Sequence, residues 1–161
     1  MIYSIYTDGS CRGNGTKQAV GAWAFLAQWD QKTMKASKVD VVPDTTNQRM
    51  EMEAIIEACQ WARDEQKLEP FDEVHIYTDS AYVHNCFEQK WYSKWLVANW
   101  INSKKQPVAN KDLWIKLIPF FENPQFYFHK VKGHDNDDLN NYVDNIVQTA
   151  TARYLKDDCS N

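Results

Sequence analysis

The sequence has few of the features that mark fibrous, disulfide-bonded or membrane-spanning chains. Five glycines and five prolines in 161 residues exclude a collagen-like or linker-like chain. Four cysteines are scattered at positions 11, 59, 86 and 159 without a Cys-x-x-Cys pair, which favours reduced thiols over a disulfide framework or a zinc site. The apolar runs near residues 20–27 and 54–62 are too short or too broken to cross a bilayer. No basic lead or long apolar stretch opens the chain, so we expect no signal peptide and a cytoplasmic location.

The composition that remains is typical of one globular domain. Hydrophobic residues make up 43% and charged residues 25%, which excludes a disordered chain. A chain of 161 residues can bury one core and is too short for two. We therefore expect a single domain over residues 1–161, structured from about residue 2 to 155. Because no long apolar stripe is left over for a second copy, we expect a monomer.

The charge of the chain is unevenly distributed. Residues 89–111 contain no acidic residue and carry +5, which leaves −9 on the rest of a chain whose net charge is −4. Four aromatic residues lie between the lysines of this segment. The net charge alone argues mildly against a nucleic-acid partner, but an acidic body with a basic, aromatic segment is a more specific feature than that average. The lysines are Lys90, Lys94, Lys104, Lys105 and Lys111, and the aromatic residues are Trp91, Tyr92, Trp95 and Trp100.

Apolar periodicity predicts a mixed α/β fold. Three strands at residues 2–7, 20–28 and 33–42 form an antiparallel start, and a helix capped by Thr45 or Thr46 follows to about residue 66. Thr45 with Gln48 fits a capping box. Strands at 74–78 and 125–131 are separated by helices, which implies parallel crossovers and hence a mixed sheet with helices packed on it. The helices are expected at 81–87, 91–102, 111–121 and 138–155.

Two segments of the sequence repeat one pattern, in which an aspartate follows a strand. Ile5-Tyr6-Thr7-Asp8 and Ile76-Tyr77-Thr78-Asp79 are followed at once by turn or helix signals. In open α/β sheets the ligand crevice lies at the carboxyl ends of the strands. Either aspartate alone is equally well explained as a turn former or helix cap. The repetition favours a shared functional role.

The first long helix supplies a third carboxylate. Its polar residues recur at helical spacing and predict a solvent-facing stripe, which contains Glu53, Glu57, Gln60 and Asp64. Glu51 instead lies on the face that carries Ala54, Ile55, Ala58 and Ala62. A carboxylate at the start of a buried face needs a cationic partner. A salt bridge to an arginine and a metal ion are both open explanations.

Two residues near the C-terminus complete the candidate set. Asp144 lies in the last expected helix beside Val143 and Val147, where a surface position is the simplest interpretation of it alone. Carboxylates without cysteine suit a hard ion such as Mg²⁺ or Mn²⁺. His134 follows a strand in a polar loop, where it is either a surface residue or a proton shuttle. The acidic run at 135–138 lacks the glycine and the distal glutamate of a calcium loop.

Four short motifs occur in order along the chain. They are Thr7-Asp8-Gly9-Ser10-Cys11 with Gly13-Asn14, Thr45-Thr46-Asn47-Gln48-Arg49-Met50-Glu51, Tyr77-Thr78-Asp79-Ser80, and Val131-Lys132-Gly133-His134 with Asp144 ten residues later. In this order they make the sequence resemble type 1 ribonuclease H, from about residue 2 to 155. Residues 90–105 resemble the basic protrusion, or handle, of the bacterial enzymes. The fold of that family, a five-stranded mixed sheet flanked by helices, agrees with the expected element order.

The resemblance implies an endoribonuclease that cuts the RNA strand of RNA–DNA hybrids and leaves 5′-phosphate and 3′-hydroxyl ends. It implies two divalent ions, Mg²⁺ or alternatively Mn²⁺, roughly 3.5–4 Å apart. The implied metal-binding carboxylates are Asp8, Glu51, Asp79 and Asp144, with His134 assisting proton transfer or product release. The implied substrate contacts are Asn14, Asn47 and Gln48 in the minor groove, the Cys11 backbone, and Thr46 and Asn110 at a phosphate of the DNA strand.

Two features of the sequence affect the expected affinity for the hybrid: the lysines of the handle, and a position at which the chain differs from some relatives. Lys94, Lys104 and Lys105 are expected to neutralise phosphates, with Trp91 and Trp95 as further substrate contacts. Helix packing is the alternative for at least two of the tryptophans. Asp44 stands where some relatives carry a phosphate-binding arginine, which predicts a weaker phosphate pocket. No separate hybrid-binding module is expected before residue 2. Two alternatives stay open: another nuclease or transposase of the same wider fold, and a non-catalytic hybrid-binding protein.

Overall fold

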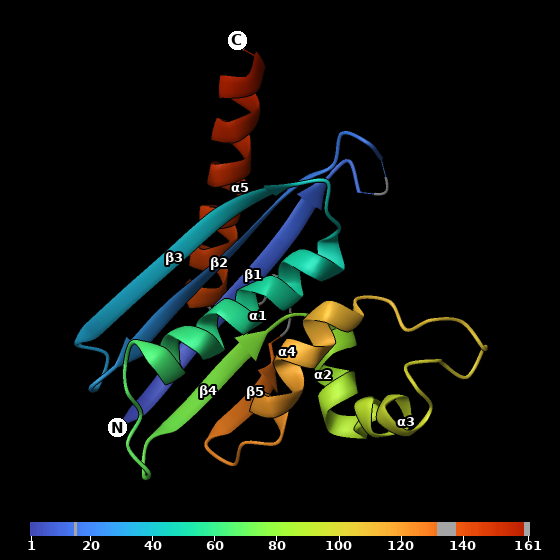
Figure 1. Ribbon diagram of the computed structural model, residues 1–161. Coiled ribbons are helices and arrows are strands. Elements are labelled where there is room, and N and C mark those ends of the chain that lie inside the picture. Colours follow the sequence, from blue (N-terminus) through green and yellow to red (C-terminus); the bar gives the residue numbers. More distant parts are fainter. Residues whose placement is uncertain (15, 132–137, 160–161) are drawn as a thin grey trace.

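A five-stranded sheet forms the centre of the molecule, and helices cover both of its faces (Figure 1). The computed structural model describes residues 1–14, 16–131 and 138–159. The strands are β1 (Ile2–Arg12), β2 (Val20–Trp29), β3 (Met34–Pro43), β4 (Glu73–Thr78) and β5 (Phe126–Lys130). The helices are α1 (Asn47–Asp64), α2 (Ala81–Gln89), α3 (Trp91–Val97), α4 (Lys111–Phe121) and α5 (Asp138–Cys159).

The strand order is β3-β2-β1-β4-β5, with β1 at the centre. β2 pairs antiparallel with both β1 and β3, whereas β4 pairs parallel with both β1 and β5. Helix α1 crosses one face of the sheet beside α4, and α5 lies against the opposite face over β1, β2 and β3 (Figure 1). This arrangement confirms the expected mixed sheet flanked by helices.

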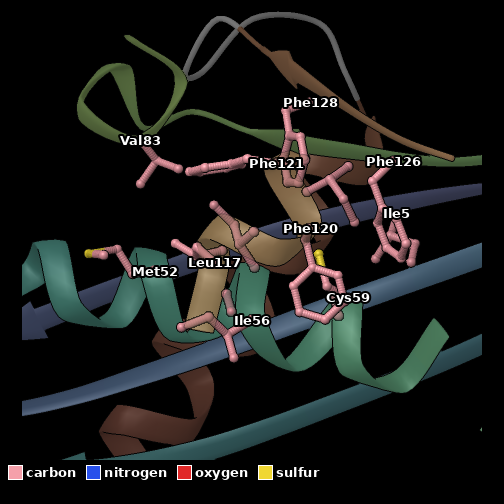
Figure 2. Close-up of a cluster of buried hydrophobic side chains, with 14 of the residues drawn as sticks. Ile5, Met52, Ile56, Cys59, Val83, Leu117, Phe120, Phe121, Phe126 and Phe128 are labelled. Atoms are coloured by element: carbon pink, nitrogen blue, oxygen red, sulfur yellow. The ribbon is translucent and has the colours of Figure 1, made fainter. Parts of the chain in front are cut away.

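Two apolar clusters hold the layers together. The larger cluster fills the space between the sheet, α1, α2 and α4, and Figure 2 shows Ile56 and Cys59 of α1 facing Leu117 and Phe120 of α4. The smaller cluster joins α5 to β2 through Ala22, Ala24, Leu26, Val143 and Val147. The alanines of β2 leave room for α5 to approach the sheet closely, and this approach decides where the polar residues of α5 lie.

The first strand is longer than its sequence predicts. We expected it to end at residue 7, but β1 continues to Arg12, because Asp8, Gly9 and Ser10 pair with Ala24, Trp23 and Ala22 of β2. Its parallel pairing with β4, in contrast, ends at Tyr6 and Tyr77. The Asp-Gly-Ser segment, which is typical of turns, therefore lies where β1 stops pairing with β4. It does not end the strand, because the pairing with β2 continues.

Two helix predictions also need correction. Thr46, and not Thr45, caps α1, and its hydroxyl oxygen accepts a hydrogen bond from the backbone N–H of Arg49 at 3.2 Å. The buried Thr45 therefore does not form the expected capping box with Gln48. Helix α3 ends at Val97, since Asn99 and Trp100 adopt left-handed backbone angles that cannot continue a helix. Within the described residues, no helix combines the length and apolar character needed to span a membrane.

Candidate active site and nucleic-acid interface

The register of the sheet places Asp8 beside Asp79. Ile5 pairs with Ile76 and Tyr6 with Tyr77, so the two similar sequence segments lie side by side in parallel strands. Each aspartate follows its tyrosine by two residues. The hydroxyl group of Thr7 donates a hydrogen bond to the carbonyl oxygen of Tyr77 at 2.9 Å and ties the two strand ends together. The repeat in the sequence thus becomes a pair of carboxylates at the carboxyl edge of the sheet.

A close approach between β1 and α1 places Glu51 at the same edge. A Cβ atom on Gly9 would lie 2.2 Å from the backbone carbon of Met50 and 2.5 Å from the nitrogen of Glu51. Both contacts are with backbone and cannot relax by a change of rotamer. Gly9 is therefore required for α1 to pack this closely, and any larger residue would move Glu51 away from the sheet.

Asp144 reaches the cluster from the opposite face of the sheet. Its neighbour Val143 is completely buried in the smaller apolar cluster. One turn later, Gln148 donates a side-chain hydrogen bond to the Ser10 hydroxyl oxygen at 3.3 Å. Packing of α5 therefore turns Asp144, which is a half-buried residue, toward Asp8. A position that looked like helix surface in the sequence lies at the candidate site.

The carboxylates affect one another electrostatically. Burial first, and then the negative charges of Asp79 and Asp144, raise the pKa of Asp8 to about 8. A hydrogen bond with the Asp144 carboxyl group acts in the same direction, and one from the backbone N–H of Gly9 opposes it. Burial also raises the pKa of Glu51 to about 7, with the charge of Asp79 adding to the effect and a hydrogen bond with Ser80 opposing it. Asp79 is thus the common neighbour of Asp8 and Glu51.

The donor set at this edge fits a hard divalent cation. Oδ2 of Asp8 is buried and accepts no hydrogen bond from any residue that the structure describes. No lysine or arginine is among the groups that affect the pKa of Asp8 or Glu51. The salt bridge to an arginine that was considered for Glu51 is therefore absent among the described residues. Among the described residues, no three Asp, Glu, His or Cys side chains already stand close enough to coordinate one ion. The support for a cation is therefore the all-oxygen chemistry and the uncompensated charge.

The raised pKa values predict how stability depends on pH when divalent ions are removed. The folded protein keeps protons on Asp8 and Glu51 that the unfolded chain releases near pH 4, so the free energy of unfolding falls as the pH rises from about 4 to 8. In chelator, Asp8→Asn should therefore melt a few degrees above the wild type at pH 8, and the difference should shrink toward pH 4. Thermal melts across this pH range measure it.

The matched control is Asp40→Asn, which changes an exposed aspartate of β3. This variant should follow the wild-type stability at every pH. Adding Mg²⁺ at pH 8 should raise the melting temperature of the wild type and raise that of Asp8→Asn less. A variant Asp8→Asn that is less stable than wild type at pH 8 in chelator would contradict the repulsion between these carboxylates.

Glu53 lies in a different place from the one expected. It is half-buried, and this burial raises its pKa, with the charges of Glu57 and Asp112 adding to the effect and those of Lys116 and Arg49 opposing it. The prediction that it faces open solvent is wrong, because α4 packs along that side of α1 and the sequence did not show this neighbour. Even so, Glu53 remains separate from the aspartates at the sheet edge, so the distinction between Glu51 and Glu53 holds.

A polar hollow of about 500 Å³ lies at the amino-terminal ends of α1 and α4. It brings together five of the six residues for which the sequence predicts substrate contacts outside the handle: Asn14, Thr46, Asn47, Gln48 and Asn110. Ala109 completes the lining. The sixth, Cys11, is adjacent, since its backbone N–H donates to Oδ1 of Asn47 at 2.6 Å. Amino-terminal ends of helices favour anions, so the hollow has the polarity to receive a phosphate.

Three asparagines of the hollow have their amide oxygens occupied by protein donors. Oδ1 of Asn14 accepts from the backbone N–H of Asn47 at 3.1 Å, and Oδ1 of Asn47 accepts from Cys11. Oδ1 of Asn110 accepts from Nη1 of Arg49 at 3.3 Å. Among the described residues none of these three NH₂ groups donates a hydrogen bond, so each can donate to a ligand. A surface of oriented donors suits phosphate oxygens, 2′-hydroxyls and the acceptors of a minor groove.

The basic segment forms a projection beside α2 and α4 (Figure 1). Lys94, Lys104 and Lys105 are all exposed there. A groove of about 490 Å³ is lined by Trp91, Lys94, Trp95, Ala98, Ile101, Asn102 and Ser103. Trp95 also contacts Trp114, with ring centroids 5.4 Å apart, and Trp114 is completely buried. Trp91 and Trp95 thus pack against the core and line the groove at once.

One predicted site residue lies outside the residues that the structure describes, and two interactions near the site were not predicted. His134 lies outside the described residues, so its role stays a prediction. Neither the interaction of Ser80 with Glu51 nor the ion pair of Arg49 with Asp112 was predicted from the sequence. Ser80 directly follows Asp79 in the repeated pattern, which was the available signal. No sequence signal joined Arg49 to a residue 63 positions away.

Comparison with known proteins agrees with this geometry. The family model of RNase H matches residues 2–152. A ribonuclease H of Clostridium botulinum (strain Hall) is 38% identical over 150 residues, which cover 93% of this chain and 95% of the relative. A ribonuclease H of Moorella thermoacetica is 38% identical over 149 residues, which cover 92% and 91% of the two chains.

Solved structures give the same result. The crystal structure of LC9-RNase H1, described as a type 1 RNase H with the type 2 active-site motif, aligns with a TM-score of 0.74 and 25% identity over 94% of this chain and 72% of that one. A foamy viral protease-reverse transcriptase in complex with RNA/DNA hybrid aligns with a TM-score of 0.75 and 18% identity, over 92% of this chain and 20% of that one. The second likeness concerns the fold alone.

Proposed function

Because this chain belongs to the ribonuclease H family, we propose that Asp8, Glu51, Asp79 and Asp144 form the catalytic centre with which it hydrolyses the RNA strand of RNA–DNA hybrids. The observation that carries this assignment is the mutual electrostatic influence of the carboxylates at the carboxyl edge of the sheet. The products carry 5′-phosphate and 3′-hydroxyl ends.

The four carboxylates would hold the divalent metal on which this family depends. When held there, two Mg²⁺ ions, or Mn²⁺ in their place, would lower the pKa of the attacking water and stabilise the charge on the leaving 3′-oxygen. The charge of Asp79 acts on both Asp8 and Glu51, so Asp79 is the residue best placed to serve both sides of the site. The Ser80 side chain interacts with the Glu51 carboxyl group and lowers its pKa against the effect of burial.

The polar hollow would position the hybrid relative to these carboxylates. Asn14, Asn47 and Gln48 donate to the minor groove, where 2′-hydroxyls distinguish the RNA strand from DNA. Thr46 and Asn110 hold a phosphate of the DNA strand at the amino-terminal ends of α1 and α4. The Cys11 backbone orients Asn47 from the side of β1. One strand is thus anchored while the other is presented to the catalytic edge.

The handle would supply attraction that the acidic body lacks. The rest of the chain carries −9 and repels a polyanion, whereas the lysines of residues 89–111 are exposed on a projection. Each lysine that neutralises a phosphate releases a counterion on binding. Trp91 and Trp95 line the groove beside Lys94 and provide aromatic surface for a nucleic-acid backbone.

Replacing Lys94, Lys104 and Lys105 together with Ala should raise the apparent KM for hybrid and leave kcat nearly unchanged at saturating substrate. The value of kcat should hold because the catalytic carboxylates are unchanged. KM should rise because each lost phosphate contact weakens binding, and it also reduces the slope of log K against log salt concentration by about 1 unit. The measurement is KM and kcat over a salt series. As a control, Lys32, Lys35 and Lys38, on the far side of the sheet, are replaced in the same way.

The control variant removes the same charge from the turn after β2 and from β3, so it should have a smaller effect on KM at every salt concentration. If both triple variants change KM equally, net charge alone decides binding. If the handle variant leaves KM and its salt slope unchanged, the handle is no binding element.

Three further assignments complete the proposal. His134, which lies outside the described residues, assists proton transfer or product release. The protein acts as a monomer, and it works in the cytoplasm. None of these depends on the four carboxylates. Size-exclusion chromatography with light scattering tests the monomer, and the activity of His134→Ala tests the histidine.

A cleavage assay on matched substrates distinguishes the proposal from its two alternatives. Labelled RNA–DNA hybrid, duplex RNA and duplex DNA are each incubated with and without Mg²⁺. The proposal predicts cleavage of the RNA strand of the hybrid only, and only with the metal. Cleavage of duplex DNA would favour another nuclease of the same wider fold, and binding without cleavage would favour a non-catalytic hybrid-binding protein.

A further inference from the structure

We infer that Arg49 and Asp112 form a positioning pair that turns the side-chain amide of Asn110, so that its NH₂ group faces the polar hollow. The inference rests on the proposed function of that hollow as a phosphate site, and it adds two residues that make no substrate contact themselves. Arg49 lies in the first turn of α1 and Asp112 in the first turn of α4. The pair therefore also joins the two helix ends between which the hollow lies.

The guanidinium of Arg49 is held in one orientation. Nη1 and Nη2 donate to the two carboxylate oxygens of Asp112 at 3.0 and 2.8 Å, which is the bidentate geometry that fixes an arginine most firmly. Nη1 also donates to Oδ1 of Asn110 at 3.3 Å. A lysine could not make the three contacts together, because its ammonium group lacks the planar fork.

The direction of the Asn110 amide follows from the chemistry of its partner. Arginine has only donors, so the atom of Asn110 that faces it must be the oxygen. The NH₂ group is then directed away from Arg49, and it makes no hydrogen bond with any other residue that the structure describes. A phosphate accepts hydrogen bonds and donates none in its charged form. With the amide reversed, the Asn110 oxygen would face the phosphate and repel it.

Asn110 has little else to fix its side chain. It precedes α4 with φ 61°, in the left-handed region, and its side chain makes no capping hydrogen bond to that helix. Without Arg49 the amide could rotate between its two orientations.

The test is a double-mutant comparison of KM and kcat on RNA–DNA hybrid with Asp112→Asn, Asn110→Ala and the two combined. Asp112→Asn releases Arg49 and should raise KM by about 3- to 10-fold, with kcat nearly unchanged. This is the loss of affinity expected when one hydrogen bond to the substrate is lost. Asn110→Ala should raise KM by a similar factor. In the Asn110→Ala background, Asp112→Asn should add nothing, because no amide is left to orient.

Two further variants separate positioning from a general effect of the ion pair. Asp64→Asn breaks the exposed ion pair of Arg63 with Asp64 at the far end of α1 and should leave KM unchanged. Asp112→Glu keeps a carboxylate for Arg49 and should recover most of the wild-type KM. Thermal melts should show little change for Asp112→Asn, since the Asp112 side chain is 63% exposed and exposed ion pairs contribute little stability.

The possible failures are distinguishable. If Asn110→Ala raises KM and Asp112→Asn does not, or if their effects are additive, the positioning role is wrong while the phosphate hollow stands. If Asp112→Asn lowers kcat and leaves KM unchanged, Arg49 acts on the neighbouring Glu51 and the inference is also wrong. If Asn110→Ala itself leaves KM unchanged, the phosphate site in the proposed function is refuted, and the positioning role is refuted with it.

Discussion

Asp79→Asn should abolish Mg²⁺-dependent cleavage of hybrid, by a factor on the order of 10³ or more. Asp79 is the common neighbour of Asp8 and Glu51, and its charge contributes to the raised pKa of both. The substitution keeps the shape of the side chain and removes the charge that would hold divalent ions. Single-turnover cleavage of labelled hybrid, with Mg²⁺ and with Mn²⁺, measures the loss.

The fold and the binding of hybrid should survive this substitution. Removing one negative charge reduces the repulsion of phosphate, so the dissociation constant for hybrid should stay the same or fall. Asp72→Asn is the matched control, because Asp72 lies at the opposite end of β4, paired with the N-terminal amino group at 3.0 Å. It should cleave like the wild type. Near-normal cleavage by Asp79→Asn would end the metal assignment.

Glu51→Gln and Glu53→Gln should differ in activity although they lie two residues apart on α1. Glu51→Gln should be inactive, because Glu51 lies beside Asp79 and burial raises its pKa to about 7. Glu53→Gln should cleave at nearly the wild-type rate, since the charged groups near it are those of α1 and α4. Initial rates under the same Mg²⁺ concentration compare the two.

This pair of variants is controlled internally, because both remove one carboxylate from the same helix. Both should fold, which thermal melts verify. An inactive Glu53→Gln beside an active Glu51→Gln would mean that the face of α1 turned toward the metal has been assigned wrongly. Loss of activity in both variants would point instead to damage to the packing of α1 against α4.

The sequence alone determined the order of the elements, and it supplied the candidate carboxylates, whose metal-binding role stays a proposal. The repeat of Ile-Tyr-Thr-Asp predicted two equivalent strand ends, and the sheet pairs these segments residue for residue. Helical periodicity separated Glu51 from Glu53, since the positions of residues on a helix follow from 3.6 residues per turn. The order of the elements could be predicted because it depends on local patterns, which a short segment specifies by itself, whereas the expected solvent-facing position of Glu53 was wrong.

The tertiary structure decided everything that depends on contact between distant segments. Pairing with β2 extends β1 beyond Asp8, and the sequence could not show this because an Asp-Gly-Ser segment forms a turn in isolation. The neighbourhood of Glu53 is set by α4, and the position of Asp144 by the packing of α5 on the alanines of β2.

The orientation of the amides in the polar hollow was likewise invisible in the sequence. Asn14, Asn47 and Asn110 are polar residues that hydrogen-bond in either direction, and only their partners fix which end donates. Those partners come from β1, from the start of α1 and from an arginine 61 residues away from Asn110. A sequence specifies which groups are present, whereas the direction of a hydrogen bond is decided by the contacts that folding brings together.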